Sequence, residues 1–333
     1  MDWLTLAVLA SRKPSICSAV KESCPDKILD SIDKKTFNDA RKLAEAELRG
    51  SESEVITQND EKYPVVLFHL ESPPVCLFMR GNADLNEVSK KSVAMVGTRK
   101  ATPQGMHIAR SFARDIASSG VSIVSGLADG IDSSSHEGCL DVDGATVAVI
   151  GSGIGKVTGR KKSFAERIMK KGAIVSEFPD NFPAGKWTFT WRNRIIAALS
   201  SAIVVVEAPE KSGALITARK AMELGRDVMA CPGLPGMSSF GGCNRLIKDS
   251  AILVDNPNDV LEVLGVNLQN NEAVLSDLES RVVAACSNPL TLDELCSTLN
   301  LPPEGVLPVL TILDLKNIIK KLPGGTYMRS SLK

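Results

Sequence analysis

The stretch Val93-Ala-Met-Val-Gly-Thr-Arg99 sets the pattern that predicts the fold of this chain. Four apolar residues end at a glycine and two polar residues, and a helix-like stretch follows. Similar short apolar runs recur at Val93–Val96, Val121–Val124, Thr146–Ile150, Ala173–Val175, Ile203–Val206, Val228–Cys231 and Ile252–Val254. Uniformly apolar strands that alternate with amphipathic helices predict an α/β fold, with a parallel sheet covered by helices on both faces.

The sequence on either side of this pattern has a different texture. Residues 1–70 are charged and helix-like, with an amphipathic stretch at Thr36–Leu48, and predict a small helical N-terminal domain. We assign residues 71–265 to the sheet domain. Residues 266–275 are rich in Asn and Gln and predict a linker, and residues 276–333 form a third domain.

The C-terminal domain has the pattern of a winged helix. Ser276-x-x-Glu279 and Thr291-x-x-Glu294 are capping boxes that open two helices. A third helix is expected from Pro303 to about Leu315, followed by a hairpin over residues 318–329 with a Pro-Gly-Gly turn. Such a unit binds DNA or docks proteins. Because the first turn of the third helix lacks a basic residue, we favour docking over reading of a DNA groove.

Composition limits the kinds of partner that the chain can bind. The 333 residues are 44% hydrophobic and 23% charged, as in a globular protein with several domains. Lys and Arg together number 39, and so do Asp and Glu. The net charge of zero excludes a uniformly basic surface, so a nucleic-acid site has to be a local patch.

The cysteines and the N-terminus indicate a cytoplasmic protein. The eight cysteines never form a C-x-x-C pair, and no histidine stands at zinc-finger spacing from them. We therefore expect reduced, mostly buried thiols and no metal site. An acid at position 2 argues against a signal peptide, and the apolar run that follows is too short to span a bilayer.

Aromatic and basic residues gather in one short segment. Five of the fourteen aromatic residues are Phe178, Phe182, Trp187, Phe189 and Trp191, and the cations Lys186, Arg192 and Arg194 lie among the last of them. Single-stranded nucleic acid offers bases that stack on rings and phosphates that attract cations. The alternative is a surface segment whose rings and aliphatic stems cover a neighbouring helix.

The loops that follow the predicted strands are rich in glycine and hydroxyl groups. They are Gly97–Arg99, Ser125–Gly130, Gly151–Gly155, Lys211–Thr217 and Pro232-Gly233. In a parallel sheet these loops share one edge, where backbone N–H groups and helix N-termini attract anions. Together they predict an anion-binding rim, although any one of them could be an ordinary turn.

Two enzyme interpretations fail on spacing. Gly151-Ser-Gly-Ile-Gly-Lys156 is neither a Walker A loop nor a G-x-G-x-x-G fingerprint, so the usual signatures of ATP and NAD chemistry are missing. Asp132 and His136 lie one helical turn apart and could suggest acid–base catalysis. With three histidines in the whole chain, we favour a helix-capping Asp and a hydrogen-bonded His. No cofactor is expected.

Several motifs occur in one order at matching spacing. They are Val93-Ala-Met-Val-Gly-Thr-Arg99, Ser125-Gly-Leu-Ala-Asp-Gly-Ile-Asp132 with His136, Gly172-Ala-Ile-Val-Ser-Glu177, Arg192-Asn-Arg-Ile-Ile-Ala-Ala-Leu-Ser200, Glu207-Ala208, Ser212-Gly-Ala-Leu-Ile-Thr-Ala218, Pro232-Gly233 and Gly242-x-Asn244-x-Leu246-Ile247. Over about residues 63–264 the chain resembles the DprA/Smf family, the bacterial DNA-processing proteins of natural transformation. The resemblance implies an extended Rossmann-like domain, flanked by a SAM-like helical domain and a winged helix.

The resemblance also implies a function without catalysis. Family members bind single-stranded DNA, form homodimers through the Rossmann-like domain and help to load the RecA recombinase. The implied DNA-binding residues here are Gly97, Thr98, Arg99, Gly126, Lys186, Phe189, Arg192, Asn193, Arg194, Ser212, Gly213 and Thr217. Of these, Arg99 and Lys186 would contact phosphate, Phe189 would support a base, and one of Arg192 and Arg194 would be a structural ion-pair partner.

The chain departs from the family pattern at two places. Asp129 stands where family members usually carry Arg or Lys, and a carboxylate there would repel phosphate. The usual Tyr-Pro segment after the third strand is replaced by the basic stretch Gly155–Lys162. Two other functions stay open: a nucleotide-acting enzyme that cleaves N-glycosidic bonds, and a regulator that binds duplex DNA through the winged helix.

Overall fold

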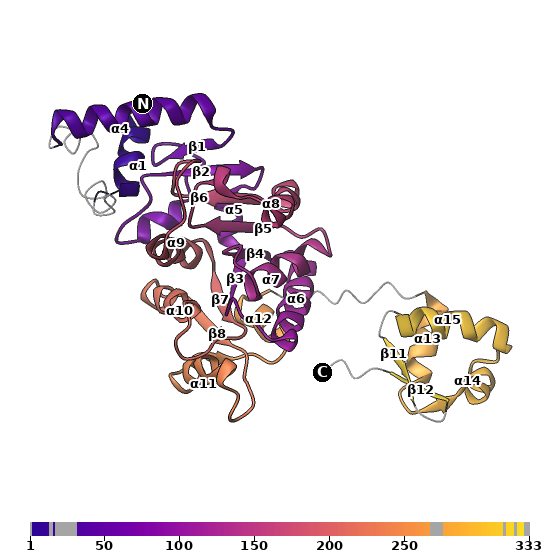
Figure 1. Ribbon diagram of the computed structural model, residues 1–333. Coiled ribbons are helices and arrows are strands. Elements are labelled where there is room, and N and C mark those ends of the chain that lie inside the picture. Colours follow the sequence, from indigo (N-terminus) through magenta and orange to yellow (C-terminus); the bar gives the residue numbers. More distant parts are fainter. Residues whose placement is uncertain are drawn as a thin grey trace. The chain divides into compact units, whose positions relative to one another are not determined.

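The computed structural model describes residues 2–12, 16, 32–266, 276–315, 318–322 and 325–329 (Figure 1). They belong to two compact units, residues 1–267 and residues 268–333. Most of the linker predicted at residues 266–275 lies outside the described residues. No described helix combines the length and the apolar character needed to cross a bilayer.

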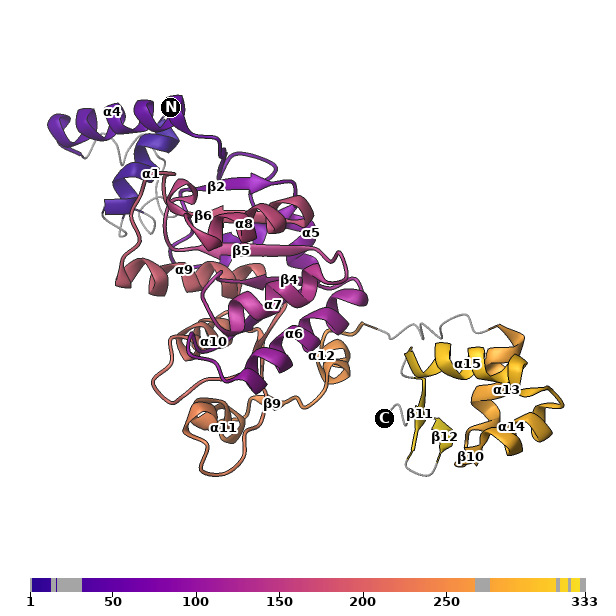
Figure 2. The same ribbon diagram turned by 45° about the vertical axis from the view of Figure 1, so that its right-hand side comes forward.

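The first unit is built on a nine-stranded sheet in the order β1-β2-β6-β5-β4-β3-β7-β8-β9 (Figures 1 and 2). The strands are β1 (Glu54–Thr57), β2 (Cys76–Gly81), β3 (Ser92–Val96), β4 (Ser122–Ser125), β5 (Thr146–Ile150), β6 (Ala173–Ser176), β7 (Ala202–Val205), β8 (Asp227–Ala230) and β9 (Ile252–Leu253). From β6 to β9 the pairing is parallel, whereas β1 and β2 are antiparallel additions at one edge. The predicted parallel sheet is confirmed.

Strand β3 shows why the sheet is covered on both faces. Val93 and Met95 point into one apolar cluster, and Ala94 and Val96 point into another. The first face is covered by α6 (Pro103–Ser118), α7 (Ile131–Leu140) and α12 (Pro257–Val263), with α8 (Arg160–Lys171) beside them. The second face carries α5 (Leu85–Lys90), α9 (Lys186–Leu199), α10 (Ala214–Glu223) and α11 (Gly241–Lys248).

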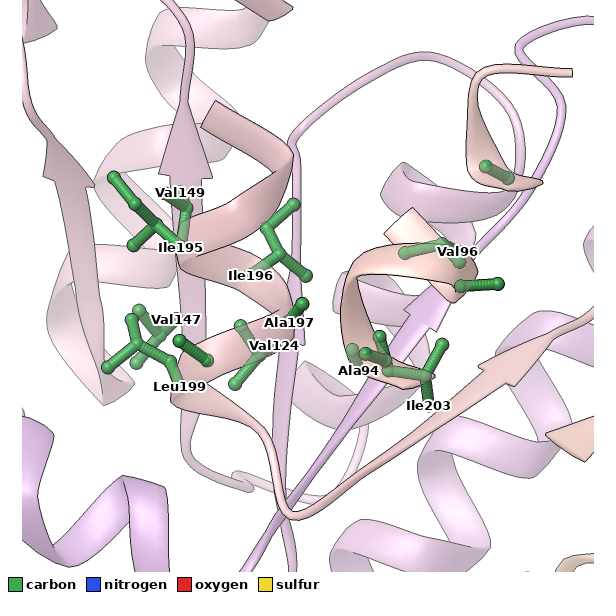
Figure 3. Close-up of a cluster of buried hydrophobic side chains, with 14 of the residues drawn as sticks. Ala94, Val96, Val124, Val147, Val149, Ile195, Ile196, Ala197, Leu199 and Ile203 are labelled. Atoms are coloured by element: carbon green, nitrogen blue, oxygen red, sulfur yellow. The ribbon is translucent and has the colours of Figure 1, made fainter. Parts of the chain in front are cut away.

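Helix α9 is polar where it begins and apolar where it ends. Its last two turns press onto the sheet, with Ile195 beside Val149 and Leu199 beside Val147 (Figure 3). Burial of such side chains contributes about 1.5–3 kcal/mol each and fixes the helix on the sheet. The first turns of α9, which carry the aromatic and basic residues, are therefore held at the carboxyl ends of the strands.

The N-terminal region differs from the expectation of an all-helical segment over residues 1–70. Helices α1 (Asp2–Arg12) and α4 (Lys34–Gly50) contact each other, but Glu54–Thr57 is strand β1 and pairs with β2. A short 3-10 helix, η1 (Val65–His69), follows. The sheet thus begins before residue 70. The sequence did not predict β1, because a four-residue strand shows no strong local pattern and is stabilised by its pairing with β2.

The second unit is the predicted winged helix. Its elements are α13 (Asp277–Ala285), β10 (Leu290–Thr291), α14 (Leu292–Leu299), α15 (Pro303–Leu315), β11 (Ile319–Lys321) and β12 (Thr326–Arg329). Ser276 and Thr291 each accept a hydrogen bond from the backbone of the Glu three residues later, so both capping boxes are confirmed. Strands β10, β12 and β11 form a small antiparallel sheet.

Five of the six described cysteines are buried. Burial raises the pKa of Cys139, Cys231 and Cys243 to about 12. These thiols therefore pack as small apolar groups, as the sequence predicted. Cys17 and Cys24 lie outside the described residues.

Candidate nucleic-acid interface

A cleft of about 360 Å³ opens where the order of the parallel strands reverses. The chain proceeds from β3 through β4 and β5 to β6 on one side, then returns to β7 on the other side of β3. Open α/β sheets bind ligands at such a switch point, outside the carboxyl ends of the strands. The lining residues are Val96, Gly97, Thr98, Arg99, Ala128, Asp132, Lys186, Phe189, Thr190, Arg192, Asn193, Ile196, Pro209, Lys211, Ser212, Gly213, Ala214 and Thr217.

The loop after β3 is held so tightly that its first residue has to be glycine. A Cβ atom on Gly97 would lie 2.4 Å from Ile131 and 2.7 Å from the backbone oxygen of Glu207. The next residue, Thr98, donates its backbone N–H to that oxygen at 2.7 Å. This anchoring brings Arg99 to the mouth of the cleft in a fixed position.

Arg99 and Phe189 form one composite surface. The exposed guanidinium of Arg99 lies 4.6 Å from the centre of the Phe189 ring, within the range of a cation–π contact. The ring also lies close to Gly151, where a Cβ atom would lie 3.0 Å from Phe189 Cδ1. Within the described part of the chain Arg99 forms no ion pair, so its charge is available to a ligand.

Lys186 begins α9 against the preference of a helix dipole. A cation is disfavoured at a helix N-terminus, and the described residues offer this exposed Lys no acidic partner. The turn itself is closed by Thr188, whose hydroxyl accepts from Gly185 N at 3.0 Å and donates to Gly185 O at 2.8 Å. Lys186 lines the cleft, as does Asn193 two helical turns further along α9.

The loop after β7 supplies the opposite wall. Ser212 accepts a hydrogen bond from Ala214 N at 3.3 Å, and Gly213 and Thr217 line the cleft with the first turns of α10. Lys211 is exposed and also lines the cleft. It was missing from the predicted site, although it opens the same loop, because a single surface Lys carries no distinguishing pattern.

Arg192 is buried at the base of the cleft beside Asp132. Its Nη1 donates to the backbone oxygen of Val149, and Gly126 leaves the space that its guanidinium fills, since a Cβ there would lie 2.3 Å from Nη1. Burial, and next the charge of Arg99, lower the pKa of Arg192 to about 10, while Asp132 opposes the shift. Burial raises the pKa of Asp132, and Arg192 counteracts it. Arg192 and Asp132 thus place two opposite charges at the base of the cleft, and Gly126 packs against the Arg192 guanidinium.

His136 has a structural place rather than an acid–base one. The Thr146 hydroxyl donates to Ile123 O, so it accepts a hydrogen bond from His136 Nδ1 at 2.7 Å. Burial and the charge of Arg192 lower the pKa of His136 to about 3, so the ring is neutral near pH 7. The prediction that Asp132 caps a helix is wrong: the N-cap of α7 is Gly130, without a side-chain cap, and Asp132 instead accepts from Ala128 N in the preceding loop at 3.4 Å.

Arg194 lies outside this cleft. It is buried, its Nη2 pairs with Glu177 Oε1 at 2.5 Å, and its guanidinium covers the Trp191 ring at 4.4 Å. Of the predicted DNA-binding residues, only Arg194 and Gly126 are absent from the lining of the cleft. From the sequence, one of Arg192 and Arg194 was expected to be a structural ion-pair partner. The ion pair with Glu177 assigns this role to Arg194.

Asp129 is neutralised by the basic segment that departs from the family pattern. Lys161, in the first turn of α8, lies 3.2 Å from the Asp129 carboxylate and donates to Leu127 O at 3.3 Å. The stretch that replaces the Tyr-Pro segment thus supplies the counter-charge for the unusual acid. The repulsion of phosphate expected at Asp129 is reduced accordingly.

The remaining rings divide as packing groups. Phe178 and Phe182 stack with centroids 4.8 Å apart, and Trp187 meets both edge-on at 5.7 and 6.3 Å. Phe189 is the one ring of the segment that lines the cleft.

Fold and site together define an α/β protein with a Rossmann-like sheet, a cationic cleft with an aromatic wall at the switch point, and a winged helix. The chain belongs to the DprA/Smf family. The model of the family described as DNA recombination-mediator protein A matches residues 54–265, and that of the DprA winged helix domain matches residues 268–325.

Individual relatives agree with this assignment. Protein Smf of Escherichia coli is 35% identical over 83% of this chain and 77% of its own length, and a putative DNA processing protein DprA of Mycobacterium tuberculosis is 35% identical over 79% and 74%. Protein Smf of Synechocystis is 40% identical over 63% of this chain, but the match spans only 54% of that protein.

Two solved structures resemble the chain. DNA processing protein A from Streptococcus pneumoniae superposes with a TM-score of 0.62 and 31% identity, over 79% of this chain and 93% of that one. The Helicobacter pylori protein, described for its single-stranded DNA binding mode, gives 0.56 and 26%, over 65% and 96%.

Proposed function

We propose that this protein binds single-stranded DNA, without sequence specificity and without catalysis, in the cleft at the switch point. One observation carries the proposal: three exposed cations, Arg99, Lys186 and Lys211, line one cleft together with the half-buried ring of Phe189. Phosphates of a flexible strand can contact the cations while a base packs on Phe189. The structural match to the H. pylori protein supports this assignment.

The cleft favours a single strand over a duplex for geometric reasons. Its wall, Phe189, is recessed among loop residues and is half-buried. A base that is paired within a duplex cannot leave its stack without the cost of unpairing, whereas an unpaired base can reach the ring.

Binding can be tested by gel shift of single- and double-stranded oligonucleotides over a salt series. We expect preference for the single strand, and a steep fall of affinity with salt because bound phosphates release counterions. The double variant Arg99→Ala/Lys186→Ala should lose binding. The control Arg114→Ala/Arg245→Ala removes two exposed cations that pair with Asp115 and Asp249, and should bind normally. Equal binding of both forms of DNA, or full binding by the first variant, would contradict the proposal.

We also propose the homodimer and the RecA partner that the family resemblance implies. Strand β9 is an edge strand whose Ile252 and Leu253 are 39% and 48% exposed. An apolar edge of this kind supports self-association of the Rossmann-like domain. Leu253→Lys should convert a dimer to a monomer in light scattering. Co-purification with RecA on single-stranded DNA tests the second partner.

The winged helix remains a second candidate for DNA contact. The described first turn of α15 carries Glu304 and no cation, which supports a docking role. In contrast, the hairpin carries Lys320, Lys321 and Arg329, the kind of charge that contacts a DNA backbone. Loss of single-strand binding on deletion of residues 268–333 would favour the winged helix.

A further inference from the structure

A second cavity, of about 640 Å³, opens beside the start of α9. It lies between α9, α10 and the segment that follows η1. The lining residues are His69, Leu70, Glu71, Ser72, Trp187, Thr190, Trp191, Arg194, Ile216, Lys220, Glu223 and Leu224. Two indole rings and a buried guanidinium therefore face one space.

The guanidinium of Arg194 has donors left over. Its side chain is 7% exposed, and Nη2 is engaged by Glu177. Nε and Nη1 are buried, and neither donates a hydrogen bond to a described residue. Arg keeps its charge and offers five N–H donors, and buried donors in folded proteins are normally satisfied. Arg194 therefore lines the cavity with a charged side chain whose Nε–H and Nη1–H groups are unpaired but lie below the cavity surface.

The two cavities share one helix. Lys186, Phe189 and Asn193 follow the spacing of one helical face and line the first cleft. Trp187 and Arg194 each follow a residue of that face directly, and together with Trp191 they line the second cavity, on a face turned by roughly 100° or more. Thr190 lies between the faces and lines both. A strand held at the first cleft can therefore reach the second cavity around the start of α9.

The lining selects the chemistry of the ligand. An apolar protein side chain would fill the volume but leave the Arg194 donors unpaired. A phosphate would make no stacking contact with the indole rings, and the carboxylates of Glu71 and Glu223 would repel it. A nucleobase has both a flat π-face for an indole and acceptor atoms for the guanidinium. Trp187 is 45% exposed and meets Phe178 and Phe182 at nearly right angles, so part of its indole surface is open to a base.

We propose that this cavity binds one nucleobase of the same single strand whose phosphates lie in the first cleft. The inference rests on the proposed function. Trp187 and Trp191 pack against the base, and a small shift of the Arg194 side chain toward the cavity lets it donate to an acceptor on the edge of the base. The cavity thus adds a second base contact, on a different face of α9 from Phe189.

Tryptophan fluorescence tests the proposal, because the chain has three Trp residues and two of them line the cavity. In a Trp3→Phe background, an oligonucleotide of about twelve thymidines should quench the emission, and its abasic analogue should not. Trp187→Ala should weaken binding of the normal oligonucleotide by about tenfold and leave the abasic analogue unaffected. Met106→Ala, which removes an equally exposed apolar side chain on α6, should change neither value.

Each outcome separates this inference from the proposed function. Absence of single-strand binding by the unaltered protein would overturn both. Binding that depends on Arg99 and Lys186, with no quenching and no effect of Trp187→Ala, would overturn the second base site alone. Quenching by thymidine monophosphate, with unchanged oligonucleotide affinity in Trp187→Ala, would also overturn it and show that the cavity holds a free nucleotide instead.

Discussion

At the scale of single residues, the cleft separates two physical contributions to binding. Arg99, Lys186 and Lys211 contribute charge, whereas Phe189 contributes a ring. Charge contacts release counterions and depend on salt, and stacking depends on salt much less. The two contributions can therefore be measured apart on the same ligand.

We predict that Phe189→Leu lowers single-strand affinity by about 1–3 kcal/mol without changing the salt dependence. Lys186→Ala should instead reduce the slope of log K against log salt by about 0.7, since it removes one phosphate contact. Fluorescence anisotropy at several salt concentrations measures both. Phe164→Leu is a matched control, because Phe164 also lies under an arginine, Arg167, but outside the cleft. A changed salt slope in Phe189→Leu would contradict the stacking role.

The buried His136 makes a prediction about pH. Its pKa is about 3 in the folded protein, compared with 6.5 for an unperturbed histidine, so the native state disfavours protonation. Its contribution to stability is complete above pH 6.5 and is lost as pH falls from 6.5 toward 3. Between pH 7.5 and 5.5 the free energy of unfolding should fall by about 1.4 kcal/mol on account of this residue.

Urea unfolding of the wild type and of His136→Gln at the two pH values measures this contribution of His136 to the free energy of unfolding. The other histidines are common to both proteins, so the difference between their pH dependences isolates His136. Equal pH dependence in the two proteins would show that the buried ring is not held neutral.

At the scale of elements, the loop before α7 and the start of α8 act together. Asp129 and Lys161 come from these two elements and approach to 3.2 Å. The pair is exposed and stabilises the fold little. Its importance lies in the potential at the rim of the cleft, where Asp129 stands next to the lining residue Ala128.

We predict that Lys161→Ala weakens single-strand binding about two- to fivefold, by ~0.5–1 kcal/mol, because it removes a cation and leaves Asp129 unpaired. Adding Asp129→Asn should restore part of the loss. Lys171→Ala is the control, since Lys171 forms a similar exposed pair with Asp143 at the other end of α8. If the two Lys variants lose equal affinity in the gel shift, the effect is one of overall charge.

At the scale of the whole molecule, the two compact units differ in the sites that they contain. The cleft and the second cavity are both built entirely from residues 1–267. The winged helix has its own apolar core, which includes Val282, Leu295 and Leu310. Each unit therefore has the internal contacts that independent folding requires.

We predict that a chain ending at residue 267 binds single-stranded DNA within about threefold of the full chain, because every lining residue of the cleft is retained. Its thermal midpoint should match the corresponding transition of the full protein. A large loss of affinity with an intact midpoint would assign part of the DNA contact to the winged helix.

The sequence by itself determined the parallel strands, the capping boxes, the three-helix pattern of the winged helix and most of the cleft. These features depend on local periodicity and on short motifs at the ends of strands, which a single chain displays directly. Arg99, Lys186 and Phe189 were predicted to lie together because parallel strands bring their following loops to one edge.

Only the tertiary structure decided which charges are free. Arg192 and Arg194 look alike in sequence, but Arg194 forms an ion pair with Glu177, whereas Arg192 lines the cleft. The same holds for Asp129, which Lys161 neutralises, and for strand β1, which exists through its pairing with β2. Burial and charge pairing arise from contacts between residues distant in the chain, and no local pattern records them.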